Sequence, residues 1–263
     1  MALTYSSYLK IEELLTLQQP LSDEKVHDEM LFIVIHQTYE LWFKQILHEF
    51  DRLQILLKNC DFSRAQFSLK RVLAILKVMI EQFDVLETML PQDFLAFRGH
   101  LETASGFQSV QFRELEFALG HKRRMIFEHL PEVSEARQRL EKRYKESTVW
   151  DAFLAGAAQS GIPVPEEVLT RDLTQPVAPS LEIQKLLINM YARSPRFVYL
   201  CELLLDLDKG FQEWRYRHVK MVERMIGEKL GTGGSEGVGY LKSTLFRPFF
   251  PDLWAIRTEL QNQ

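Results

Sequence analysis

Hydrophobic residues recur along most of this chain every three or four positions, which is the spacing of one face of an α-helix. The clearest example is the segment 27–57, where polar and charged residues fill the positions between the apolar ones. We therefore predict one long helix there, with one side buried in a core. The apolar positions that follow this spacing include Leu31, Val34, Ile35, Leu41, Trp42, Ile46, Phe50 and Leu53.

Two other segments predict long helices. One covers residues 63–89, with Ser63 as a candidate N-cap and Pro91 after its end. The other covers residues 196–226, and Gly227 follows it as a residue that can close a helix. No alternating strand pattern of useful length is present, so we predict an all-α multi-helix bundle built on several long antiparallel helices. Shorter helices around it are predicted at 91–101, 106–119, 132–144 and 181–191.

Two segments interrupt the helical pattern. Residues 161–179 contain four prolines, which predicts a long, irregular connection. Residues 231–239 contain five of the 12 glycines of the chain. They do not form a phosphate-binding P-loop, because the Gly-Lys-Ser/Thr ending is missing and no strand precedes them. Such a run is either a surface loop or a loop that folds over a ligand, to which Thr232 offers a hydroxyl.

The composition limits the classes of protein that this chain can belong to. Its 263 residues are 46% hydrophobic and 26% charged, which suits a sizeable core in one large or two small domains. The formal net charge of -4 indicates no basic face for nucleic acid. No apolar run approaches the roughly 18 residues of a membrane span, and the first residues do not resemble a signal peptide. Two cysteines, Cys60 and Cys201, are too few for a disulfide scaffold, so we predict a cytoplasmic protein.

Two histidines lie within predicted long helices. His36 lies on an apolar face, with Phe32 one turn before it and Glu40 one turn after it. A histidine in this position is either a hydrogen-bonded core residue or an acid–base group in a pocket. His218 has Trp214 one turn before it, and it can either pack in the core or bind haem iron. Spacing alone leaves both alternatives open for each histidine.

Other metal and binding chemistry has weaker support. A di-iron bundle needs two Glu-x-x-His pairs, and the sequence contains one, Glu24 and His27. That pair also spans the predicted start of a helix. No His-Glu-x-x-His or Cys-x-x-Cys motif is present. Arg98 follows Phe94 by one turn, so its guanidinium could hold a carboxylate while the ring covers an apolar group. An arginine near a helix end is otherwise simply solvated.

Taken together, four segments resemble one known family, the tryptophan 2,3-dioxygenases. The residues between His27 and Trp42 are similar to the distal haem-pocket helix of that family. The segment 214–218, Trp-Arg-Tyr-Arg-His, resembles its proximal helix, and 231–235, Gly-Thr-Gly-Gly-Ser, resembles its substrate-covering loop. The segment 105–109, Ser-Gly-Phe-Gln-Ser, resembles its haem-pocket segment. The resemblance extends from about residue 5 to residue 257, in the order of the family.

The resemblance implies an activity and roles for individual residues. The family uses haem b (iron protoporphyrin IX) to insert O2 across the indole C2–C3 bond of L-tryptophan. The product is N-formyl-L-kynurenine, and the reaction is the first step of the kynurenine pathway. His218 would be the axial iron ligand, and the catalytic residue His36 would accept a hydrogen bond from the indole N–H. Phe32 would pack on the indole, Arg98 would pair with the substrate carboxylate, and Thr232 would hold the amino-acid end.

The resemblance also implies an assembly. Residues 1–263 would form a single haem dioxygenase domain, in which the segment 1–20 reaches the pocket of a neighbouring subunit within a homotetramer. The family commonly has tyrosine in place of Phe94, and loss of that hydroxyl predicts weaker tryptophan binding. Tyr5, Tyr8 and Leu9 would contact the neighbouring substrate, and Phe83, Ser105 and Gly106 would lie near the haem.

Three other hypotheses remain at this point. The chain could be a haem sensor or carrier that keeps His218 without turnover, or a helical scaffold with no cofactor. It could also resemble the indoleamine dioxygenases, which are monomeric and have a broader substrate range. That family lacks the distal histidine, so His36 favours the tetrameric enzyme.

Overall fold

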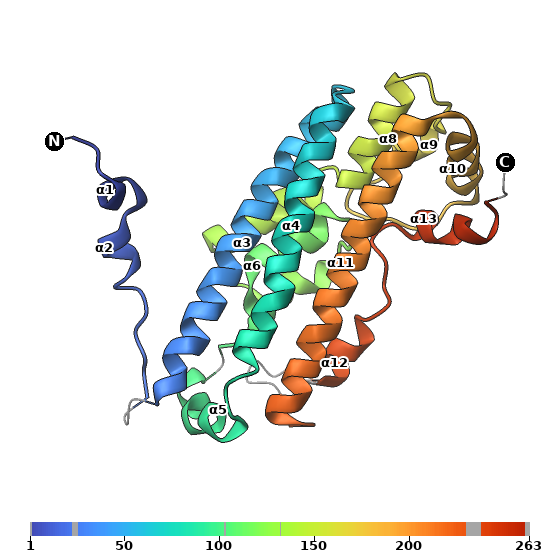
Figure 1. The fold of residues 1–263 in the computed structure, drawn as a ribbon. Helices are drawn as coiled ribbons and strands as arrows, with labels where there is room; N and C mark the ends of the chain where they lie inside the picture. The colour runs from blue at the N-terminus through green and yellow to red at the C-terminus, as the bar shows by residue number, and fades with distance from the viewer. Residues whose placement is uncertain (1, 23–25, 103, 132, 230–237, 261–263) are drawn as a thin grey trace.

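Three long helices form the centre of the molecule. A computed structural model describes residues 2–22, 26–102, 104–131, 133–229 and 238–260. Helix α4 (Phe62–Leu86) packs against both α3 (His27–Lys58) and α11 (Pro195–Ile226), as Figure 1 shows. Within the described ranges every regular element is helical, so the predicted all-α class is confirmed.

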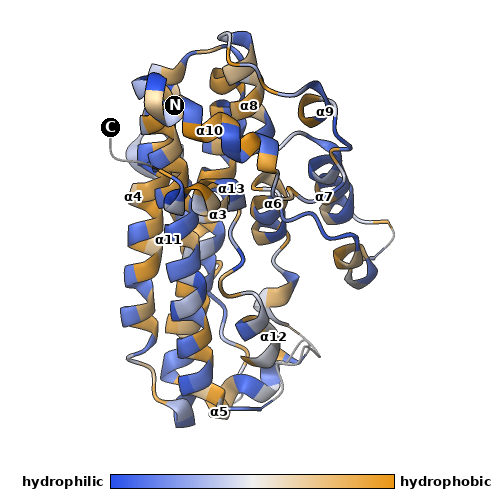
Figure 2. Ribbon diagram, turned by 90° about the vertical axis from the view of Figure 1, so that its right-hand side faces the viewer, coloured by the Kyte–Doolittle hydropathy of each residue, from blue (hydrophilic) through white to orange (hydrophobic). Residues whose placement is uncertain are grey.

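The pattern of apolar residues explains why these helices pack together. Their hydrophobic residues form stripes along α4 and α11 (Figure 2), and the inward side chains belong to one buried cluster. This cluster extends from Ile35 on α3 to Ile256 near the end of the chain. The predicted helices 27–57 and 196–226 are confirmed, and Gly227 closes α11 with φ of 60° in the left-handed region.

The second long helix differs from the prediction at both ends. Asp61, not Ser63, is the N-cap, because its carboxylate accepts the Arg64 backbone N–H at 3.2 Å and Phe62 already packs in the core. The helix ends at Leu86 rather than at residue 89, and a separate helix, α5 (Pro91–Arg98), begins with the proline at its first turn.

The predicted helix 106–119 is interrupted. A short 3₁₀ turn, η2 (Gly106–Gln108), precedes α6 (Val110–Ala118), because the Ser109 hydroxyl accepts the Phe112 backbone N–H and starts a new helix there. Another 3₁₀ turn, η1 (Gly99–Leu101), completes the predicted segment 91–101.

Helix α8 (Val149–Gln159) was not predicted. It begins with a reciprocal capping box between Thr148 and Asp151, and buries Trp150 and Phe153. Its residues are mostly small or apolar, and only Asp151 and Gln159 mark its less buried face as polar, so the sequence gives a weak signal for it. The remaining short elements are η3 (Arg124–His129), α7 (Glu135–Lys145), α9 (Glu166–Leu169), α10 (Leu181–Arg193), α12 (Val238–Ser243), α13 (Pro251–Ala255) and η4 (Ile256–Thr258).

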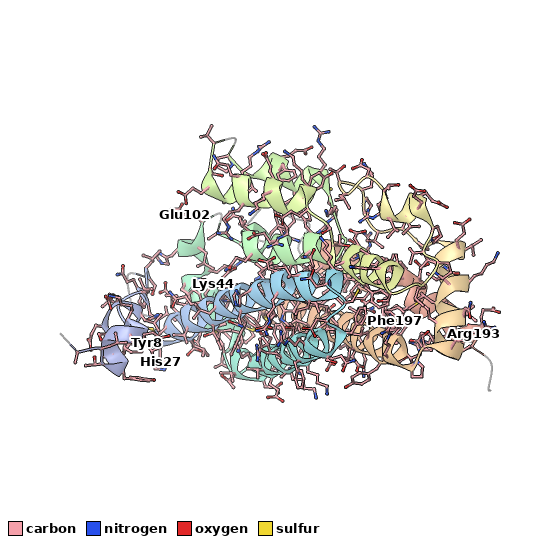
Figure 3. All side chains as sticks on the ribbon, turned by 90° about the horizontal axis from the view of Figure 1, so that it is seen from above. Tyr8, His27, Lys44, Glu102, Arg193 and Phe197 are labelled. Atoms are coloured by element: carbon pink, nitrogen blue, oxygen red, sulfur yellow. The ribbon has the colours of Figure 1, made fainter. Side chains whose placement is uncertain are left out.

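The N-terminal helices stand apart from this core. Figure 1 shows α1 (Tyr5–Leu9) and α2 (Ile11–Leu14) separated from the bundle, and neither contains a buried residue. In Figure 3, Tyr8 and Arg193 lie on opposite sides of the molecule. Among the described helices, none is both long and apolar enough to cross a membrane.

The packing of α8 on α3 generates a prediction about stability. A Cβ atom at Gly156 would lie 2.2 Å from the Leu57 carbonyl oxygen, which is backbone and cannot rotate away. We therefore expect Gly156→Ala to lower the free energy of unfolding by about 1–3 kcal/mol, as measured by denaturant titration. Gly99→Ala is the matched control, because no atom lies within 4 Å of its Cβ position. Equal stability of the two variants would contradict this close approach.

Candidate functional site

A cavity of about 290 Å³ lies among α3, α4, α5, α6, α11 and α12. Its wall is mostly aromatic and aliphatic, which suits a flat apolar ligand, and a few polar groups interrupt it. The lining includes Phe32, His36, Glu40, Phe83, Met89, Phe94, Arg98, Ser105, Gly106, Phe112, Arg113, Glu116, Trp214, Arg215, His218 and Leu241.

His36 is held in one tautomer. Its Nδ1 lies 2.7 Å from the Phe32 carbonyl oxygen, and a carbonyl can only accept, so Nδ1 carries the proton. This leaves Nε2 as the acceptor of the imidazole. Burial lowers the pKa of His36, although the Phe32 carbonyl and the Glu40 carboxylate oppose that effect. The side chain is therefore a neutral hydrogen-bond acceptor at pH 7.

His218 lines the same cavity from α11. The Trp214 ring stacks on its imidazole, with centroids 5.4 Å apart and planes at 16°, and Phe83 lies at 6.2 Å. Burial is the main cause that lowers its pKa to about 4, and repulsion from His36, when that ring is protonated, and from Arg113 adds to it. Its imidazole has no hydrogen bond to any residue in the described part of the chain. A neutral, uncommitted imidazole is the form that binds a metal ion.

An aromatic cluster forms the cavity wall near His36. The Phe32 ring lies 4.0 Å from the His36 ring and 5.8 Å from the Phe94 ring. Phe97 is fully buried behind both phenylalanines, and its ring meets the Phe94 ring edge-on at 5.4 Å. Arg98, at the end of α5, lines the cavity beside this cluster. A charged guanidinium next to stacked rings can bind an amino acid that carries an aromatic side chain.

The structure brings most of the predicted site residues together. Phe83, Ser105 and Gly106 also line the cavity, and the Ser105 hydroxyl accepts the Phe107 backbone N–H at 3.3 Å. The predicted N-terminal residues, however, are not in this chain's own cavity. Thr232 lies outside the described residues. Tyr5, Tyr8 and Leu9 lie on α1 and are exposed.

Sequence reasoning missed the charged residues of the cavity wall. Arg113 and Glu116 are three residues apart on α6, and Arg215 reaches the same carboxylate from α11. The spacing of Arg113 and Glu116 is a recognisable signal for a helical ion pair, but that pattern usually marks a solvated surface. No group of three or more His, Cys, Asp or Glu suited to a metal ion occurs among the residues the structure describes.

The fold and the site define a class of protein: an all-helical bundle with an apolar cavity between two neutral imidazoles. A family model described as tryptophan 2,3-dioxygenase matches residues 1–128 and 182–260. A protein of Herpetosiphon aurantiacus named tryptophan 2,3-dioxygenase is 59% identical over 98% of this chain and 99% of its own length. Proteins with the same name from Anaeromyxobacter sp. and Caulobacter vibrioides are 48% and 45% identical over 98% of this chain, covering 97% and 98% of their own lengths.

The chain therefore belongs to the tryptophan 2,3-dioxygenase family, and the resemblance found in its sequence is confirmed. The match covers α3, α4, α5, α6 and α11, which are the elements that carry the cavity.

A third buried histidine supports the wall beside Arg215. His121 Nε2 lies 3.1 Å from the Pro248 carbonyl oxygen, so Nε2 carries the proton, and Nδ1 faces the Arg215 guanidinium at 3.4 Å. Burial, together with the Arg215 charge, lowers the pKa of His121 to about 4. Protonation of Nδ1 would place two positive charges in contact, so the folded protein disfavours the charged form of His121.

We expect His121→Gln to weaken the acid sensitivity of folding. The imidazole titrates near 6.5 in the unfolded chain and near 4 in the folded one, so between these values the unfolded state binds more protons and stability falls with pH. Between pH 7 and pH 5 the wild type should lose about 2 kcal/mol more unfolding free energy than the variant. Denaturant titrations at both pH values measure this difference, with the exposed His48→Gln as control. Equal losses in wild type and His121→Gln would contradict it.

Proposed function

We propose that this chain is an enzyme that adds both atoms of O2 across the indole C2–C3 bond of L-tryptophan and forms N-formyl-L-kynurenine. Family membership supports this reaction. The structural observation that supports it most is that His36 and His218 line a single apolar cavity, one as a hydrogen-bond acceptor and the other as a potential metal ligand. His36 has an oriented acceptor, whereas His218 has no hydrogen-bond partner among the described residues.

The cavity fits the haem b on which this family depends. The fit rests on the buried, uncommitted imidazole of His218, which would be the axial ligand, and on the apolar surface around it. Phe83, Ser105 and Gly106 would contact the porphyrin. Bound haem supplies the activation of dioxygen, which amino-acid side chains alone do not provide.

His36 and Phe32 would bind the indole. With Nδ1 committed to the Phe32 carbonyl, Nε2 of His36 can accept the indole N–H, which fixes the rotation of the ring. The Phe32 ring, 4.0 Å from the imidazole, covers an apolar face of the same space. The neutral state of His36 is essential, because an imidazolium would offer the indole nitrogen a donor instead of an acceptor.

Arg98 would hold the substrate carboxylate. Its position at the end of α5, beside Phe94, places a permanent positive charge at the rim of the aromatic cluster. Thr232 would bind the amino-acid end as the glycine-rich loop covers the substrate and excludes water. Phe94 adds no hydroxyl for the carboxylate, so this part of the site relies on the guanidinium.

The N-terminal segment 1–20 would complete the cavity of a neighbouring subunit in a homotetramer. Its helices carry exposed apolar side chains and bury none of them in their own chain, which is typical of a segment that packs elsewhere. Tyr5, Tyr8 and Leu9 would be the contacting residues. Most of the other buried side chains belong to one large core, beside a small cluster of Phe117, Ile126, Phe127 and Leu140. We propose that the chain forms a single domain and that the assembly is cytoplasmic.

His218→Ala tests the haem assignment. We expect this variant to lose stable haem binding, because the only proposed axial ligand is removed. The haem absorption band of the purified protein measures binding, and formylkynurenine production from tryptophan under reducing, aerobic conditions measures turnover. His48→Ala, an exposed histidine on α3, is the control. Full haem retention with an unchanged spectrum would refute the assignment. A haem-loaded wild type without turnover would indicate a sensor or carrier instead.

Arg98→Leu tests the substrate contact. Loss of a charged pair with the carboxylate should cost about 2–5 kcal/mol of recognition, which corresponds to a fall in kcat/KM of roughly 30-fold or more. Steady-state kinetics with tryptophan measure the fall, and haem content should not change. Arg64→Leu, on an exposed part of α4, is the matched control. An unchanged kcat/KM in Arg98→Leu would remove this residue from the site.

A further inference from the structure

Two buried arginines face the cavity from different helices and share one carboxylate. Arg113 Nη1 donates to Glu116 at 2.6 Å, and Arg215 Nη2 lies 3.6 Å from the other oxygen of Glu116. All three residues line the cavity and are at most 7% exposed. Because long-range pairing across α6 and α11 holds both guanidiniums in place, this part of the wall is rigid.

The charges of this group are not balanced within the wall. Burial alone would raise the pKa of Glu116, but the guanidiniums of Arg113, Arg123 and Arg215 outweigh it and hold the pKa below its usual value. The carboxylate is therefore ionised, and its single negative charge faces two cavity-lining cations. Arg123 also pairs with Glu116, at 2.6 Å, whereas Asp208, which attracts Arg215, does not line the cavity. Burying an excess of positive charge costs desolvation free energy unless a bound anion neutralises it.

Both guanidiniums keep donors for a ligand. A guanidinium has five N–H groups. Arg113 uses Nε and Nη2 on the Phe107 carbonyl and Nη1 on Glu116. Arg215 uses Nη1 on the Arg247 carbonyl and Nη2 toward His121, and its Nε donates to no described residue.

Aromatic rings fix the planes of these two side chains. The Arg113 guanidinium lies 4.7 Å from the Phe107 ring centroid, and the Arg215 guanidinium lies 4.6 Å from that of Phe249. A fixed planar fork with free N–H groups suits the two oxygens of a carboxylate, which binds such a fork through parallel charge-assisted hydrogen bonds.

We propose that Arg113 and Arg215 form a carboxylate-binding site for a propionate group of the haem, separate from the site of the amino-acid carboxylate at Arg98. This inference rests on the proposed function. Arg98 adjoins Phe32 and Phe94 near His36, on the side of the aromatic cluster. Arg215 instead lies one helical turn before His218 on α11, and Trp214, which stacks on His218, packs against Phe112, the neighbour of Arg113 on α6. The arginine pair therefore belongs to the side of the iron ligand.

The test compares two porphyrins on haem-free full-length protein. Iron protoporphyrin IX carries two free carboxylates, whereas its dimethyl ester has the same ring and iron without them. Dissociation constants come from the haem absorption band and from quenching of tryptophan fluorescence, in one buffer for both. The wild type should bind the free acid about tenfold more tightly than the ester, as one lost charged pair predicts. Arg113→Met and Arg215→Met should each remove most of that preference and leave ester binding unchanged.

Two further variants distinguish binding from folding. Arg196→Met removes an arginine of α11 that also packs over phenylalanine rings, but outside the cavity, and should keep the wild-type preference. Arg113→Lys keeps the charge without the fork and should give an intermediate preference.

Several outcomes would overturn the proposal. Equal affinity of the wild type for acid and ester would do so, and so would variants that weaken both porphyrins alike, which would indicate a structural role. Variants that weaken tryptophan binding while the porphyrin preference persists would assign the pair to the substrate. Failure of the wild type to bind either porphyrin would instead refute the haem assignment itself, so the two proposals fail in different ways.

Discussion

Burial keeps the imidazoles of His36 and His218 neutral where they line one cavity, and the chemistry of this protein depends on that constraint. In water both rings would titrate near pH 6.5 and would be partly charged at a slightly acidic pH. Inside the bundle, desolvation lowers the pKa of His36 and of His218, so one ring offers an acceptor and the other a metal-binding lone pair. The helices α3, α4 and α11 provide this environment because their apolar faces exclude water from the space between them.

The arginines around these two neutral imidazoles form two separate groups. Arg98 lies at the aromatic rim, where a substrate carboxylate would bind, whereas Arg113 and Arg215 lie deeper in the wall with Glu116 between them. The deeper group costs desolvation free energy, and its rigid aromatic and carbonyl contacts hold it in position before any ligand binds. A site arranged in advance loses less conformational entropy when it binds.

The sequence predicted the elements whose signals are local. The helices 27–57 and 196–226 were clear because their apolar positions repeat along one face, and both histidines were found because they lie in segments that resemble a known family. Helix α8 was missed because only two polar residues, Asp151 and Gln159, mark its less buried face, and the other residues are small or apolar. The roles of the two histidines were not decided by spacing, since a packed histidine and a ligand histidine have the same neighbours along a helix.

Sequence alone was therefore sufficient for the all-α class, the long helices and the family, because helical periodicity and short motifs are properties of neighbouring residues. Tertiary packing decided which side chains meet: the shared cavity of His36 and His218, and the contact of Arg215 with Glu116 across two helices. It also decided the protonation states, because a pKa depends on burial and on charges that come from distant parts of the chain. No pattern along one helix contains that information.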